Sequence, residues 1–537
     1  MHSAVSAAAR WTPLPAAGAL LLCSCALLPP APPPNDHIGS YPGRPRPATA
    51  PAPSTTAAAT RPAAGPLTVS LDEAILMALE RNQGLSVQRI DPSIFREIEQ
   101  QERAAFDLDA IVEAASARRR EPGTDPPVVI WTDKTVDAAL SQRLPTGTDY
   151  SVGITGSRLT SNLRNDRYVT RVGLTVNQAL LRGAGLNVNL ATIRQAAIDT
   201  RISEYELRRF AEVLLADVES TYWDYALAQR TIEIVTNAMT LAEQQVVETR
   251  ERINVGKLPE TELAAAAAEL ARRRENLINA RSRLATTRLR LLRLLNPADE
   301  DFWGRQVVLT SVPSRPAADL DDVETYVQVA LRMRPELNQA RLAVRREDLE
   351  LVRTRNGLLP RMDAFIEFGM TGYSDSFGTS LRNIARDKYD VLVGVALQYP
   401  PANRAAEARH QREVFTRQRA VRAVDNLAQL VQVDVRSAYI EVARAQEQVA
   451  ATAATRRFQE ETLRAETEKF RVGKSVSFLV AQAQRDLLDS QISEVRAVVA
   501  YLQALINLHL QSGALLQRRG IAAPGAAAVD PSAPPRR

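Results

Sequence analysis

The sequence predicts a membrane-associated α+β protein built from two copies of one unit. Two long stretches, residues 186–255 and 402–472, contain no glycine or proline, and both end at the valine of a Val-Gly-Lys tripeptide. Segments in which apolar residues alternate precede each long stretch. The segment DVESTYWDYALAQ at 217–229 matches DVRSAYIEVARAQ at 434–446, and this pair shares one offset of 217 residues with the two Val-Gly-Lys sites. A collinear period of this length indicates a duplication rather than a short structural repeat.

The amino terminus has the pattern of a bacterial export signal. Arg10 precedes the apolar run LPAAGALLLCSCALL, which is too short to span a bilayer as a helix. The residues before Cys25 resemble a lipobox, so we expect a signal peptide at 1–25 and acylation of Cys25. Ordinary cleavage near Ala26, without a lipid, is the alternative. A proline- and alanine-rich segment at 26–66 predicts a flexible leader.

Composition excludes several classes of function. Of the chain's two cysteines, Cys23 and Cys25, neither lies in its body, so no disulfide framework or cysteine metal site is expected there. The four histidines lack ligand spacing. The net charge is +5 and the arginines are scattered through the predicted helices, which gives no reason to expect nucleic acid. No nucleotide-binding, nucleophile or metalloprotease motif occurs, so we predict neither an enzyme nor a cofactor.

Each half of the chain has the same order of predicted elements. The first repeat, 67–312, opens with the helical pattern LDEAILMALERNQGL, and the second, 313–515, opens with its counterpart VETYVQVALRMRPEL. Strand-like segments, a very long helix, the Val-Gly-Lys break and a returning helix follow in both. The residues at 516–537 predict a disordered tail.

The two predicted long helices are too long for an ordinary globular core. Seventy residues at about 1.5 Å each give roughly 105 Å. Helices of this length must pack against other helices. The returning segments at 260–295 and 474–512 are rich in alanine and leucine, which suits close packing against them.

Residues 389–399, YDVLVGVALQY, alternate apolar and mostly small or polar side chains between Tyr389 and Tyr399. Eleven such residues with an aromatic at each end are typical of a tilted transmembrane barrel strand, with the tyrosines at the two membrane interfaces. A soluble antiparallel sheet with one wet face is the alternative. Similar or weaker patterns occur at 361–373, 110–117, 136–143, 150–157 and 169–178, and LPTGTDY joins two of these segments as a hairpin.

Residues 68–515 resemble the TolC family of outer-membrane efflux proteins. The resemblance lies in LDEAILMALERN, ALRMRPEL, the LLP motif at 358–360, VGLTVNQALLRGAG at 172–185, and the two Val-Gly breaks. It implies a homotrimer in which each chain gives four strands to a shared 12-stranded outer-membrane β-barrel, joined to a long periplasmic α-helical barrel. It also implies a passive conduit of a tripartite efflux or type I secretion system, which docks a periplasmic adaptor protein and an inner-membrane transporter.

The resemblance assigns roles to particular residues. The helix-turn-helix tips that would dock the partners are Val255, Gly256, Lys257, Val472, Gly473 and Lys474. An ordinary hairpin loop without a partner is the alternative. The candidate pore constriction is formed by Glu262 and, in the second half, Gln482.

The chain departs from the family pattern in three places. Leu479 stands where the second half would carry an acidic residue, so a carboxylate ring would come from Glu262 alone. Ala179 replaces the proline of the first strand-to-helix corner. Six strand-like runs stand where the family barrel needs four, which leaves one hairpin that could lie outside the membrane.

Two other classes of protein would share some of these features. A periplasmic adaptor lipoprotein would show one hairpin inside flanking β-domains, not two collinear copies. A structural periplasmic coiled coil would not explain the alternation at 389–399. We therefore expect a protein of the outer membrane that extends into the periplasm and is anchored by lipid if Cys25 is acylated.

Overall fold

The structure is a computed structural model that describes residues 65–122, 128–162, 164–298, 302–314, 320–385, 388–472, 474–522, 524–525 and 528–529. The described residues belong to one compact unit, Ala64–Arg537. The predicted signal peptide, Cys25 and nearly all of the predicted leader lie outside the described residues.

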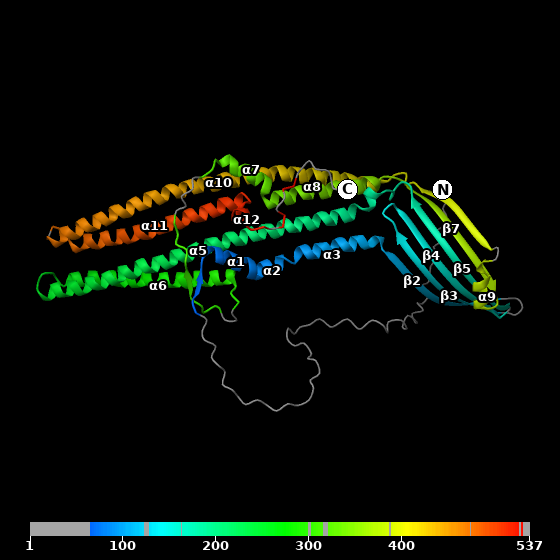
Figure 1. The fold of residues 1–537 in the computed structure, drawn as a ribbon, viewed down its shortest axis with the longest axis horizontal. Helices are drawn as coiled ribbons and strands as arrows, with labels where there is room; N and C mark the ends of the chain where they lie inside the picture. The colour runs from blue at the N-terminus through cyan, green and yellow to red at the C-terminus, as the bar shows by residue number, and fades with distance from the viewer. Residues whose placement is uncertain are drawn as a thin grey trace, which may run out of the picture. The chain divides into compact units, whose positions relative to one another are not determined.

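Four long helices form two hairpins (Figure 1). Helix α5 (Ala191–Asn254) packs against α6 (Thr261–Leu295), and α10 (Arg404–Arg471) packs against α11 (Ser477–Gln511). The absence of glycine and proline therefore predicted both long helices correctly. The first begins later than expected, because a separate turn of helix, α4 (Leu186–Asn189), precedes it.

Shorter helices accompany the hairpins in each half. The first half contributes β1 (Leu67–Val69), α1 (Leu71–Arg81), α2 (Gln83–Gln88), α3 (Asp91–Arg103), the 3₁₀ turn η1 (Ala104–Phe106) and β6 (Val307–Leu309); the second contributes α7 (Val323–Met333) and α8 (Pro335–Asn356). Ser70 caps α1, since its Oγ accepts from the Glu73 amide at 3.3 Å while the Glu73 carboxylate accepts from the Ser70 amide at 2.8 Å. Strands β1 and β6 pair in parallel, which brings the start of the first repeat beside its end.

The main core lies where α1, α6 and α11 cover the middle of α5. Tyr222 of α5 is fully buried, and its hydroxyl donates to the Val69 carbonyl at 3.2 Å. Leu291, Leu292 and Leu295 of α6 are also fully buried. Burying each such leucine contributes about 1.5–3 kcal/mol relative to exposure. The core therefore holds α5, α6 and α11 together at a distance from the hairpin tips.

The described part of the predicted tail packs against the helices. Helix α12 (Leu515–Arg518) buries Leu515 and Leu516 in the main core, whereas Val529 is buried in a separate cluster with Tyr205 and Leu342. None of the helices within the described residues is long and apolar enough to span a bilayer.

Six antiparallel strands form one sheet in the order β2-β3-β4-β5-β7-β8. They are β2 (Leu108–Pro122), β3 (Val128–Arg143), β4 (Thr148–Ser161), β5 (Arg164–Ala179), β7 (Arg361–Ser374) and β8 (Tyr389–Gln398). Every strand-like run in the sequence lies in this sheet. The resemblance implies four strands from each chain, and the sheet has six, because the first half runs four strands between α3 and α5 whereas the second runs two between α8 and α10. The hairpin β2–β3 is therefore not detached from the other strands.

At the level of β8 the register gives the sheet one apolar and one polar face, and Lys134 and Arg158 lie on the apolar side only beyond that level. Cross-strand neighbours share a face, so apolar residues from all six strands fall into rows. One such row consists of Ala110, Leu140, Val152, Leu174, Phe368 and Val391. The opposite face carries Glu113, Asp137, Thr155, Arg171, Glu367 and Asp390. This division suits a strand with lipid on one side and water on the other.

Candidate functional site

The first hairpin turns at Gly256 in a defined helix-capping motif. The Lys257 amide donates to the Arg252 carbonyl at 2.8 Å, and the Gly256 amide donates to the Ile253 carbonyl at 2.8 Å. This pair of bonds is the Schellman motif, which needs a left-handed residue after the helix. Gly256 has φ +71°, and a Cβ there would meet no atom within 4 Å. The glycine is thus required by its backbone conformation and not by lack of space.

The second hairpin repeats this turn. The Lys474 amide donates to the Lys469 carbonyl at 2.8 Å, with the same spacing as Lys257 and Arg252. Gly473 itself lies outside the described residues. The returning helix begins at Ser477, three residues later than the sequence predicted.

Both tips expose apolar side chains. Val255 is 66% exposed and Val472 is 65% exposed, while Lys257 and Lys474 are exposed beside them. On the second tip the exposed apolar set continues with Val476, Phe478 and Leu479. Clustered apolar side chains with neighbouring charges are typical of a surface that binds another protein.

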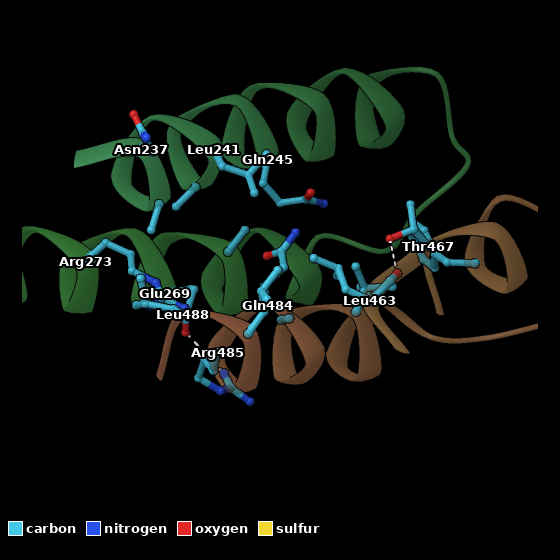
Figure 2. A pocket seen from close by; sticks show the side chains of 18 of the residues that line it. Asn237, Leu241, Gln245, Glu269, Arg273, Leu463, Thr467, Gln484, Arg485 and Leu488 are labelled. Atoms are coloured by element: carbon cyan, nitrogen blue, oxygen red, sulfur yellow. Dashed lines mark hydrogen bonds and ion pairs between the residues drawn. The ribbon is translucent and has the colours of Figure 1, made fainter. Parts of the chain in front are cut away.

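Polar contacts join the two hairpins close to their tips. Ser477 of α11 donates to the Glu262 carboxylate of α6. About two turns further from the tip, Arg485 Nη1 lies 3.1 Å from Glu269 Oε2, and Arg273 Nη2 lies 2.6 Å from Glu269 Oε1 (Figure 2). The Glu269 side chain is 14% exposed, so these contacts are shielded from water. We call the Ser477–Glu262 and Arg485–Glu269 pairs the inter-hairpin contact.

A groove of about 1220 Å³ separates the hairpins beside this contact. Figure 2 shows Leu241 and Gln245 of α5, Leu463 of α10 and Gln484 of α11 around it. Its walls come from all four long helices, so its size depends on the distance between the two hairpins.

The structure separates the two residues predicted for the constriction. Glu262 is half-buried and faces the second hairpin, whereas Gln482 is exposed and does not line the groove. Asp486 and Asp489 are exposed at four and seven residues after Gln482, so the three share one face of α11. Asp486 and Asp489 were not predicted from the sequence, although their helical spacing from Gln482 was the available signal.

Strand β8 begins at Tyr389 and ends one residue before Tyr399, and the two tyrosines are 69% and 66% exposed. Ten residues of strand at about 3.3 Å each, tilted by about 40°, span roughly 25 Å along a barrel axis. This height equals the apolar band of outer-membrane barrels, about 25 Å. The positions therefore suit the predicted role at the two membrane interfaces.

On the polar face, Arg171 of β5 reaches across β7 to Asp390 of β8. Two N–H groups of its guanidinium donate to the two carboxylate oxygens at 2.6 Å each. Gly369 leaves room for this pair, since a Cβ there would lie 2.3 Å from Arg171 Nη2. Bidentate pairs of this kind are strong and directional, so this face is built to hold charge.

Comparisons with known proteins agree with this architecture. A family model described as outer membrane efflux protein matches residues 132–297 and 326–514. Among solved structures, a membrane protein from Pseudomonas aeruginosa is 17% identical with a TM-score of 0.63, and the match covers 82% of this chain and 93% of that one. The CmeC outer membrane channel of Campylobacter jejuni is 14% identical with a TM-score of 0.61, covering 86% and 87%.

The open state of the Neisseria gonorrhoeae MtrE outer membrane channel is 16% identical with a TM-score of 0.60, covering 83% of this chain and 89% of that one. No curated protein sequence matches this chain. At these identities the structural matches establish the fold, and the family model extends over both halves.

Proposed function

Because the chain belongs to the outer membrane efflux protein family, we propose that it works as a homotrimer whose hairpin tips dock a periplasmic adaptor and an inner-membrane transporter. The chain is an outer-membrane efflux channel component that extends into the periplasm. Its role is passive, and the energy for transport comes from the partner. An adaptor lipoprotein or a structural coiled coil does not fit a chain that the channel family model matches in both halves.

The observation that carries the docking proposal is the pair of matching tips. Both close with the same backbone bond, from Lys257 to Arg252 and from Lys474 to Lys469. Both expose a valine and a lysine, and they stand at the ends of α5 and α10 that are remote from the sheet (Figure 1). Two similar tips per chain give a trimer six docking positions.

The inter-hairpin contact supports a gating role for the tip region. The pairs Ser477–Glu262 and Arg485–Glu269 hold the second hairpin against the first. A partner that separates the hairpins must break both pairs. Glu262 acts in this proposal as part of the closure, while Gln482, Asp486 and Asp489 face away from the groove and supply the polar stripe of the constriction.

The membrane attachment and the division of the chain complete the proposal. Cys25 carries the lipid as the first residue left after cleavage before it, and the leader 26–66 separates it from the two repeats, 67–312 and 313–515. An acyl-bearing cysteine with two or three chains anchors stably. The mature protein should therefore carry an amino-terminal mass increase that Cys25→Ala abolishes.

Photo-crosslinking in the native host tests the docking proposal. A photoreactive amino acid at Val255 or Val472 should form a covalent adduct with a periplasmic adaptor, identified by mass spectrometry. Ile440, which is 67% exposed on α10 far from the tip, is the matched control. Adducts at Ile440 alone, or none at either tip, would rule out the tips as the docking surface.

A further inference from the structure

The hairpin β2–β3 pairs with the edge of β4 that would be open in a chain with only the four strands β4, β5, β7 and β8. Strand β3 pairs with β4 from Arg143 opposite Asp149 to Trp131 opposite Ser161. Strand β4 therefore has no free edge, and the open edges of the sheet are β2 and β8. Side chains are exposed along the whole of β2 and along all of β8 except Gly394. Long edges of this kind invite pairing with another chain.

The hairpin has the same two faces as the other strands. Two neighbouring rows are apolar across the full sheet, from Ala110 and Val112 of β2 to Val391 and Tyr389 of β8. The opposite face of the hairpin carries charged groups, namely Asp109, Glu113, Asp133 and Asp137. The apolar face of the hairpin therefore lies at the same height along the strands as the apolar face of its neighbours. Its register thus suits a position within the membrane.

The directions of the edge strands permit closure. Strand β2 follows α3 and η1 and runs away from the helices, whereas β8 ends just before α10 and runs toward them. An even number of antiparallel strands therefore leaves two edges of opposite direction. Strand β8 of one copy beside β2 of the next is an antiparallel pair, as the rest of the sheet requires.

The width of six strands matches the helices to which they connect. Helices α3, α5, α8 and α10 pack side by side and lead to or from β2, β5, β7 and β8 in the same order (Figure 1). Four helices at about 8–10 Å spacing occupy roughly 32–40 Å. Six strands at about 4.8 Å and a tilt of about 40° occupy roughly 38 Å, whereas four would occupy roughly 25 Å.

We propose, resting on the trimer put forward above, that β8 of each copy pairs with β2 of the next and closes an 18-stranded barrel from three six-stranded sheets. Its backbone diameter is about 36 Å, against about 24 Å for 12 strands of the same tilt. The partner for each exposed edge is thus a second copy of this chain. The exit through the outer membrane is as wide as the helical tunnel, so the barrel does not restrict bulky cargo.

Cysteine crosslinking between copies tests the seam. Val393→Cys on β8 is combined in turn with Ala110→Cys, Val112→Cys or Ala114→Cys on β2, all of which share the apolar face. One of these pairs should give covalent trimers on oxidation. The matched control is Val393→Cys with Ile154→Cys on β4, which should not link copies, because β2 and β3 separate β4 from the seam. Each single-cysteine variant controls for native Cys25.

The outcomes separate this inference from the proposed function. Native mass and channel activity are measured first, and a protein that forms no trimer overturns the proposed function. A conducting trimer that crosslinks through Ile154→Cys, or through no β2 position, overturns only the 18-stranded barrel. End-on electron cryomicroscopy of the wild-type trimer gives a second readout: a ring of about 36 Å supports the seam, and one of about 24 Å contradicts it.

Discussion

Replacing Arg485 by alanine should favour opening of the tip region. Arg485 lies 3.1 Å from Glu269 across the two hairpins, and no other ion pair of Arg485 is present within the described residues. Glu269 keeps Arg273 at 2.6 Å when Arg485 is removed, so the substitution leaves no buried charge uncompensated. The change therefore weakens the inter-hairpin contact without disturbing α6 itself.

The size of the effect follows from the burial of the pair. The Arg485 and Glu269 side chains are 28% and 14% exposed. A hydrogen bond between charged groups contributes about 1.5–3 kcal/mol when shielded and an exposed ion pair about 0–1 kcal/mol, so about 1–2 kcal/mol per chain is expected here. This corresponds to a shift of about 5–30-fold in the ratio of open to closed hairpins.

Open probability in planar lipid bilayers measures this shift. Arg274→Ala is the matched control, because Arg274 pairs with Glu243 at 3.4 Å within the first hairpin and both side chains are well exposed. The control should change open probability by less than about fivefold. The reasoning is refuted if Arg485→Ala behaves like wild type, or if Arg274→Ala opens the channel equally.

Three further predictions concern stability. Gly256→Val should destabilise the first tip by about 1–2 kcal/mol, measured by amide exchange, because Gly256 has φ +71°. Gly256→Asn should destabilise it less, and equal losses of stability would exclude the conformational explanation. Burial, and then the charge of Arg518, lower the pKa of His509 from 6.5 to about 4 in the folded protein. Between pH 6.5 and about 4 the unfolded state therefore binds more protons than the folded state, and thermal stability should fall as the pH falls through this range. His509→Gln should flatten that dependence, and an unchanged slope would exclude His509 as its source. Leu291→Ala should cost about 2–5 kcal/mol in thermal unfolding, since Leu291 is fully buried, whereas Leu289→Ala, at a site 43% exposed, should cost far less; similar losses would contradict the packing described for α6.

The sequence was sufficient to predict the helices and strands because their patterns are local. The freedom from glycine and proline predicted α5 and α10 almost to their ends, and period-two alternation located all six strands. The sequence could not predict the break between α4 and α5, because no glycine or proline marks Leu190, the residue there with φ −90° and ψ 2°. Helix boundaries set by packing leave no such mark.

Contacts between distant residues were beyond reach for a different reason. Ser477 meets Glu262 only because two hairpins pack in one register, and the pair is 215 residues apart in the chain. The LPTGTDY turn correctly predicted that β3 pairs with β4, but the alternation does not reveal that β5 of the first half pairs with β7 of the second. Register between elements depends on packing across them, which a single sequence does not display.

The most direct test of the channel account is to measure native mass and bilayer conductance on one sample of the purified, detergent-extracted protein. The account predicts a particle of three chains that inserts into planar lipid bilayers and produces discrete conductance steps. A monomer that inserts nowhere and carries no current would contradict it, and the apolar face of the sheet would then need another partner than lipid.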